Sequence, residues 1–124
     1  MLYSELTEKI IKAFYTVYNK LGYGFLEKVY ENALVIELKK LGLNILQQQK
    51  IMVKYNGSNV GEYFADLVIN KVIIIELKAA EGLVEEHKNQ LINYLKATDK
   101  EVGLLLNFGK KPQVKRVIFT NDRK

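Results

Sequence analysis

Apolar positions recur at intervals of three and four residues near the start of the chain, which is the spacing of an amphipathic helix. Ser4 is the predicted N-cap of this helix, and Gly22 is its predicted end. A second helix is predicted over 25–41, with Gly42 as its stop. The chain therefore opens with a pair of helices separated by a short glycine-rich breaker.

The second helix carries an apolar stripe that begins next to an acid. Tyr30, Leu34, Leu38 and Leu41 follow helical spacing along one face. Glu27 lies three residues before Tyr30 on that same stripe. The pattern thus predicts a carboxylate on the inward face of this helix.

From residue 43 onward the apolar spacing becomes that of strands, with one further helix. Tight turns are predicted at Asn56-Gly57 and at Asn70-Lys71. The predicted strands span 45–55, 61–69, 72–78, 102–108 and 114–119, and the third helix spans 83–96. The order α-α-β-β-β-α-β-β predicts an α/β fold with a mixed β-sheet flanked by helices, because a meander of strands precedes a helical crossover.

Three charged residues interrupt the most apolar part of this pattern. Asp66 lies in the second predicted strand, and Glu76 and Lys78 lie near the end of the third. Glu76 and Lys78 share one face of their strand, and Asp66 can approach them across the hairpin. Buried charges are costly unless they pair, accept hydrogen bonds or bind a metal. The alternative to a functional site is an ordinary ion pair between Glu76 and Lys78.

The third predicted helix also directs polar side chains inward. If Leu91 and Tyr94 face the sheet, then His87 and Gln90, each four residues earlier, project into the same sector. These side chains either line a cleft or form structural hydrogen bonds where the helix meets the sheet.

Composition limits the classes of function that are open to the chain. With 124 residues and no cysteine, we expect one domain over 1–124, without disulfides, thiolate metal sites or thiol nucleophiles. Charged residues within the first amphipathic pattern argue against a signal peptide, and no apolar run suits a membrane helix. We therefore expect a cytoplasmic protein without a membrane partner.

Positive charge is concentrated toward the C-terminus. Residues 83–124 carry nine Lys and Arg against five Asp and Glu. The candidates for contact with a polyanion such as nucleic acid are Lys110, Lys111, Lys115 and Arg116. A solvated tail that only aids solubility explains the same charge.

The misplaced acids suggest a metal site. Glu27, Asp66 and Glu76 together with Lys78 would carry a net negative charge, which repels itself unless a cation binds. Carboxylate oxygens suit Mg²⁺ or Mn²⁺ better than Zn²⁺. Such a metal activates water and stabilises charge on a phosphate. Lys78 would either act on the attacking water or hold the phosphate.

These residues also resemble a known family. Asp66 followed by Glu76-Leu77-Lys78 resembles the D…(D/E)xK signature of the PD-(D/E)xK nuclease-like superfamily. The stretch from Gly24 to Tyr30 resembles the GxxExxY pattern, which names a group of small proteins within that superfamily. The likeness also includes 31–34, 61–63, the His87…Gln90…Tyr94 spacing and 106–109, so it extends over roughly 9–119.

The resemblance implies a restriction-endonuclease-like core and a site with defined roles. Asp66 and Glu76 would be metal ligands, joined by Glu27, and Lys78 would be the catalytic lysine. Gln90 would support the site, with His87, Tyr94 and Tyr30 around it. The implied activity is a metal-dependent nuclease acting on DNA or RNA, and a homodimer is expected if both strands of a duplex are cut. The alternative is a catalytically silent nucleic-acid-binding or protein-interaction module with the same fold.

Overall fold

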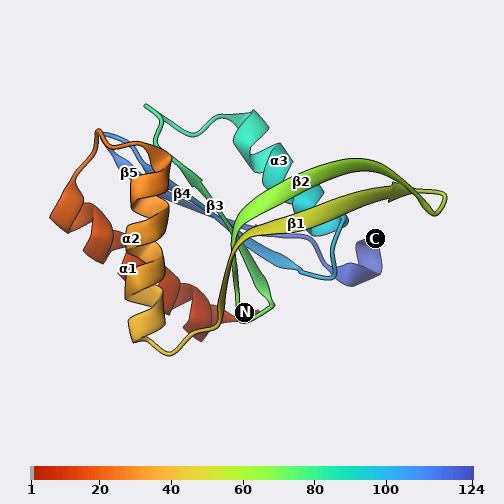
Figure 1. Cartoon of the computed structure of the whole chain (residues 1–124), viewed down its shortest axis with the longest axis horizontal. Coiled ribbons are helices and arrows are strands. Elements are labelled where there is room, and N and C mark those ends of the chain that lie inside the picture. The colour runs from red at the N-terminus through yellow and green to blue at the C-terminus, as the bar shows by residue number, and fades with distance from the viewer. Residues whose placement is uncertain (1) are drawn as a thin grey trace.

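The structure is a computed structural model that describes residues 2–124. The helices and strands follow the predicted order and end in a short 3-10 helix, η1 (Figure 1). Their bounds are α1 Ser4–Leu21, α2 Glu27–Lys40, β1 Ile45–Tyr55, β2 Ser58–Ile69, β3 Ile73–Lys78, α3 Glu85–Lys96, β4 Val102–Phe108, β5 Pro112–Ile118 and η1 Asn121–Arg123.

The strands form a five-stranded mixed sheet in the order β1-β2-β3-β4-β5. β3 and β4 are parallel, because α3 carries the chain back across the sheet between them, and the other neighbouring strands are antiparallel. The predicted mixed sheet flanked by helices is therefore confirmed. The parallel pair brings the C-terminal ends of β3 and β4 to the same edge, where Lys78 lies opposite Asn107.

Helices cover both faces of the sheet. α1 and α2 bury one face over a cluster that includes Phe14, Leu34 and Ile75, while α3 buries the other face through Leu91 and its neighbours. β4 approaches α3 closely at Gly103, where a Cβ would lie only 2.7 Å from the Leu91 side chain. The apolar run of β3 is buried on both sides, as its composition predicts.

The β1–β2 hairpin extends well beyond the rest of the sheet (Figure 1). Its ladder reaches from Ile45–Ile69 to the Tyr55–Ser58 pair, whereas the β2–β3 ladder covers only the last three residues of β2. Both predicted turns are present. Asn56-Gly57 and Asn70-Lys71 have positive φ at each position, which suits tight hairpin turns.

Several predicted boundaries differ from the structure. Tyr3, rather than Ser4, is the N-cap of α1, and it makes no side-chain capping bond. The first turns of α2 and α3 begin two residues later than predicted. Leu41 of the predicted stripe is exposed, because α2 ends at Lys40. Within residues 2–124, none of the helices has the length and apolar character that crossing a bilayer requires.

Candidate active site

Asp66 and Glu76 lie at the point where β2 separates from β3. The ladder between these strands ends at Leu67 and Ile75, and the two acids are the next residues on each strand. Side chains replace the ladder there: the Leu77 N–H donates to Asp66 Oδ2 at 2.7 Å, and the Asp66 N–H donates to Glu76 Oε2 at 3.3 Å. Where the strands separate, each carboxyl group is therefore held by a hydrogen bond from a backbone N–H.

The environment of Glu76 favours its neutral form. Glu76 is 5% exposed, and its pKa is raised to about 10, with burial as the largest cause. The hydrogen bond with the Asp66 side chain and the charge of Asp66 contribute to this rise, while the Asp66 N–H and the charge of Lys78 oppose it. At neutral pH and without a cation, Glu76 therefore keeps its proton.

Lys78 ends β3 on the same side as Glu76. It is half-buried, and its positive charge lowers the pKa of Glu76, which places it within electrostatic range of the acid pair. Among the described residues, however, no ion pair joins Lys78 to Glu76 or Asp66. The simple ion-pair explanation of the ExK pattern is therefore not supported, and the ammonium group is not tied to either acid.

Asn107 fixes the chain just after Lys78. It is fully buried, accepts from the Ala80 N–H at 2.9 Å and donates to the Ala80 carbonyl at 3.0 Å. It also donates to Gln113 at 2.9 Å. Position 109 must be glycine for this contact, because a Cβ there would lie 1.9 Å from the Ala80 oxygen. Residues 106–109 thus hold the segment that follows β3 in place.

The α3 residues predicted for the site lie on the same face of the sheet as the acids. Tyr94 is 5% exposed, and its hydroxyl accepts from Gln90 Nε2 at 2.9 Å. The pKa of Tyr94 is raised to about 12, first by burial and then by the nearby carboxyl groups of Glu76 and Asp66. The Gln90–Tyr94 pair therefore borders the acid pair.

His87 has a structural contact. Its Nδ1 accepts a hydrogen bond from the Val84 N–H at 3.2 Å, which caps the start of α3. The hydrogen-bonding explanation offered by the sequence therefore accounts for its position.

The prediction that Glu27 faces inward is wrong. Glu27 is the first residue of α2 and is exposed, because the buried stripe begins only at Tyr30. Its role as a metal ligand stays a prediction. Tyr30 is fully buried, donates to the Gly22 carbonyl at 2.6 Å, and accepts from the Phe25 N–H at 3.2 Å. Its ring stacks on Phe108 at 4.4 Å, so it secures the turn between α1 and α2.

Two residues near the acids were missed. The Glu31 side chain is 5% exposed, and its carboxylate accepts from Lys28 Nζ and from the amides of Gln47 and Gln48, all within 3.0 Å. Gln48 Nε2 also lies 3.2 Å from Asp66 Oδ1. Gln48 has φ 50° in the middle of a strand, and its side chain thereby connects the acid of α2 to the acid of β2.

The two residues differ in whether the sequence could have identified them. Glu31 lies three residues before Leu34, beside the apolar stripe, so helical spacing allows it to be found. Nothing in the sequence around Gln48 indicates a left-handed backbone.

The donor set fits a hard divalent cation. Within residues 2–124 no group of three Asp, Glu, His or Cys side chains gathers as a metal site. Asp66 and Glu76 nevertheless offer oxygen ligands from adjacent strands, and the pair favours holding a proton when no cation is bound. Mg²⁺ is commonly held by one or two carboxylates and keeps several waters. These two acids are therefore the residues that would hold it.

The four predicted polyanion contacts do not form one patch. Lys110 and Lys111 are exposed in the turn after β4, at the sheet edge where Lys78 also lies. Lys115 and Arg116 are consecutive in β5, so their side chains point to opposite faces. The Arg116 guanidinium donates to the Leu2 carbonyl. Of the four, only Lys110 and Lys111, in the turn after β4, lie at the end of the sheet where β3 ends with Lys78.

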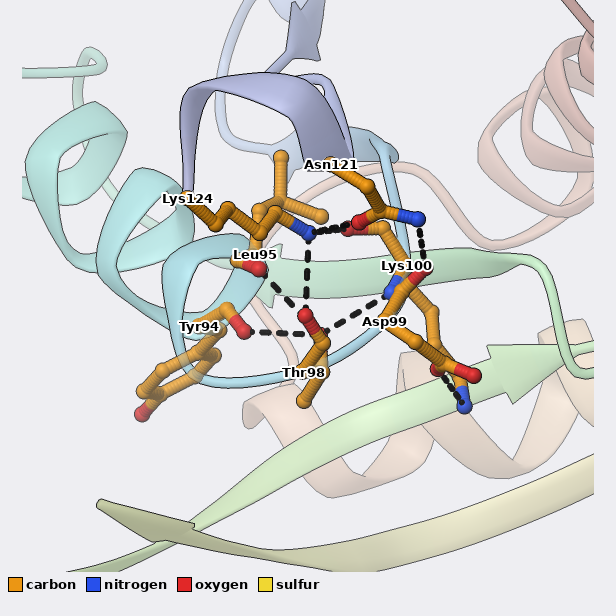
Figure 2. A network of polar contacts seen from close by, with 7 residues as sticks. All are labelled: Tyr94, Leu95, Thr98, Asp99, Lys100, Asn121 and Lys124. Carbon is orange, nitrogen blue, oxygen red and sulfur yellow. Dashed lines mark hydrogen bonds and ion pairs between the residues drawn. The ribbon is translucent and has the colours of Figure 1, made fainter. Parts of the chain in front are cut away.

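The last residue of the basic tail has an internal role. Figure 2 shows the ammonium of Lys124 beside the end of α3. It donates to the carbonyls of Thr98 at 2.9 Å and Lys100 at 2.6 Å, and to Asn121 Oδ1 at 2.6 Å. The Thr98 hydroxyl in turn donates to the Tyr94 carbonyl at 2.9 Å. Part of the C-terminal charge therefore stabilises the loop between α3 and β4.

Comparison with known proteins gives the same fold. The crystal structure of a protein designated SSO0001 superposes with a TM-score of 0.62 at 23% identity, covering 95% of this chain and 59% of that one. This chain therefore spans less than two thirds of that protein's length. A search of curated proteins finds no significant match. The sequence pattern of the PD-(D/E)XK nuclease superfamily matches residues 4–117, and the chain belongs to that superfamily.

Proposed function

We propose that the protein is a divalent-metal-dependent nuclease that hydrolyses phosphodiester bonds in DNA or RNA. The observation that carries this proposal is the geometry of Asp66 and Glu76, which are held by backbone groups where β2 leaves β3. Membership of the nuclease superfamily supports the same activity. Mg²⁺ or Mn²⁺ is the expected cofactor, since the available ligands are carboxylate oxygens.

Each residue of the site has a distinct role in this proposal. Asp66 and Glu76 would hold the metal, whose contribution is to activate water and to stabilise charge on the phosphate. The Leu77 N–H keeps the Asp66 carboxylate oriented, because it donates to Oδ2 at 2.7 Å. Lys78, at the end of β3, would either deprotonate the attacking water or hold the phosphate electrostatically. Gln90 would position Tyr94, because its amide donates to the Tyr94 hydroxyl.

We also propose the narrower placement of the chain among the GxxExxY proteins. The contacts of Tyr30 support this placement, because they give the last position of the pattern a physical role in closing the turn between α1 and α2. Gly22 and Gly24 have positive φ, which agrees with a breaker between the helices. The pattern would then serve mainly to set the direction in which α2 enters the fold.

A direct assay separates the nuclease from a contaminant. The protein would be incubated with single-stranded, duplex and branched DNA, and with RNA, in Mg²⁺ and in Mn²⁺. We expect cleavage by the wild type, its loss in Asp66→Ala and in Glu76→Ala, and its retention in Glu62→Ala. Glu62 is a suitable control because it is an exposed acid on the same hairpin. Cleavage that survives both site substitutions would contradict the proposal.

One observation favours a second function, which is nucleic-acid binding without turnover. No third acid joins Asp66 and Glu76 among the described residues, and Glu76 favours its neutral form. A protein of this kind would bind nucleic acid in a salt-dependent manner and without any requirement for metal. Calorimetric titration with Mn²⁺ distinguishes the two functions, because saturable binding that disappears in Asp66→Ala is expected only of the nuclease.

A further inference from the structure

A groove of about 830 Å³ lies between α3 and the projecting β1–β2 hairpin. Its volume falls within the range of sites that hold small molecules, roughly 300–1,000 Å³. Tyr63 lines it from the hairpin, and Asn89, Gln90 and Asn93 line it from the helix. Figure 1 shows where α3 and the β1–β2 hairpin lie in the fold.

The groove and the candidate active site share two residues of α3, although neither Asp66 nor Glu76 lines the groove. Gln90 and Tyr94 belong both to its lining and to the border of the acid pair. The rings of Tyr63 and Tyr94 are 5.6 Å apart, so an aromatic surface leads from the hairpin toward the acids. A ligand in the groove would therefore contact Gln90 and Tyr94, which border the acid pair.

The chemistry of the lining combines an aromatic face with amides. Tyr63 is 48% exposed, so its ring is open to stacking by a planar group. Asn89, Gln90 and Asn93 each carry a donor and an acceptor, which is what the polar edge of a nucleobase requires. Stacking on aromatic side chains with hydrogen bonds to the base edge is the usual way in which unpaired bases are recognised.

Charge at the groove is compatible with a nucleotide. Lys54 and Lys96 line the groove and are exposed, whereas Glu86 is the acid on its lining. The cations can approach a sugar-phosphate backbone that leaves the groove. The charged side chains of the lining therefore do not repel a polyanion.

We propose that this groove holds one unpaired nucleobase of the substrate, so that the enzyme acts on nucleic acid with a single-stranded segment. The inference rests on the proposed nuclease function and names its substrate class. A base inside a duplex is paired and stacked, and it must be extruded before it can enter such a pocket, at a cost of a few kcal/mol. Single strands, flaps and branch points meet no such barrier.

The helical wall of the groove is fixed, which favours a defined binding site. The Thr98 hydroxyl donates to the Tyr94 carbonyl, and Lys124 donates to the Thr98 carbonyl (Figure 2). These bonds hold the C-terminal turn of α3, from which Tyr94 reaches the groove. Pre-formed walls reduce the entropy lost when a ligand binds.

Binding of short oligonucleotides that carry 2-aminopurine tests the inference. Affinity would be measured by fluorescence in EDTA, so that no cleavage occurs, for single-stranded DNA, for the same sequence in RNA and for duplex DNA. We expect Tyr63→Ala to weaken single-strand binding by about 10-fold or more and Tyr63→Phe to retain it, because the phenyl ring still stacks. Tyr55→Ala is the matched control, since Tyr55 is 68% exposed on the same hairpin and is not part of the lining.

The outcomes separate this inference from the proposed function. Equal single-strand affinity in Tyr63→Ala and Tyr55→Ala would overturn the proposal that the groove binds an unpaired base, even if the wild type cleaves in Mg²⁺. Tighter binding of duplex than of single strands would also overturn it. Single-strand binding that depends on Tyr63, without cleavage in any metal, would support base binding in the groove and would contradict the proposed nuclease activity. The DNA and RNA arms identify which sugar the site accepts.

Discussion

The side-chain amide of Gln48 donates to Asp66 Oδ1 over 3.2 Å, and this contact depends on a backbone conformation that glutamine rarely adopts. The same nitrogen donates to Glu31 at 3.0 Å. A left-handed residue in the middle of a strand costs roughly 1–2 kcal/mol. The strain therefore lies beside the acid pair, where it orients a side chain.

Substitution of Gln48 separates the strain from the contact. We expect the free energy of unfolding of Gln48→Gly to exceed that of Gln48→Ala by about 1 kcal/mol, because glycine accepts φ 50° without strain. Urea titration measures this difference. Both variants should lose much of the cleavage rate, since neither can donate to Asp66. Gln49→Ala, an exposed neighbour, is the control. Equal stability of the two Gln48 variants would refute the strain argument.

The pH dependence of folding should report on Glu76. Its pKa is about 10 in the folded protein against 4.5 for the free side chain. Between these values the unfolded chain releases a proton that the folded chain keeps, so the free energy of unfolding of the metal-free protein falls as pH rises. Glu76→Gln should be more stable than the wild type at pH 8, by a few kcal/mol at most. Chemical denaturation at pH 5 and pH 8 measures this.

The control for that experiment is Glu62→Gln, because Glu62 is an exposed acid in a surface ion pair. Its stability should follow the wild type at both pH values. If Glu76→Gln shows no larger gain at pH 8 than at pH 5, Glu76 does not keep its proton in the folded state.

Metal binding should release protons. If the ion binds to ionised Glu76, each binding event displaces the proton that the pair holds, so Mn²⁺ affinity rises with pH by up to tenfold per unit below pH 10. Calorimetry in two buffers of different ionisation enthalpy gives the number of protons released. Asp66→Ala should abolish the heat of binding, and an affinity that does not change with pH would contradict the protonated pair.

Asn107 should be critical for stability rather than for chemistry. Asn107→Ala removes the partners of the Ala80 N–H and carbonyl, which leaves buried backbone groups unpaired. We expect a loss of about 2–4 kcal/mol in the free energy of unfolding. Asn19→Ala, at an exposed position of α1, should have little effect. Urea titration followed by circular dichroism compares them, and equal midpoints would show that the Asn107 bonds contribute little.

The turn lysines should govern the salt dependence of binding. Replacing Lys110 and Lys111 by alanine should reduce the slope of log affinity against log salt by roughly 1–2 if both contact phosphates. The matched control is Lys39→Ala with Lys40→Ala, which removes the same charge from the far end of α2. A similar slope change in both double variants would indicate a general charge effect.

Periodicity and turn chemistry were sufficient to predict most of the fold. The Asn56-Gly57 and Asn70-Lys71 turns require positive φ, and these residues tolerate it, so the meander followed from local preference. The apolar run of β3 marked a strand buried on both faces. The approach of Asp66 to the charged end of β3 was also predicted, because the short turn brings the two strands together, and the ladder ends at Leu67 and Ile75 directly beside Asp66 and Glu76.

The remaining errors depend on tertiary context. Helical spacing alone placed Glu27 inward, but no part of the core reaches the first turn of α2, so the acid is solvated. The tail cations were grouped by sequence, whereas strand alternation sends Lys115 and Arg116 to opposite faces. The contact from Gln48 to Asp66 required a backbone angle that no residue pattern encodes.

The length of the β1–β2 hairpin has a practical consequence. Its tip, at Asn56-Gly57, lies beyond the β2–β3 ladder and away from the acids, so residues inserted there would lengthen one wall of the groove and leave the carboxylates in place. Insertions at such exposed tips are usually tolerated. The hairpin is therefore the natural position for changing how much of a strand the protein covers, or for attaching a fluorophore that reports when the groove is filled.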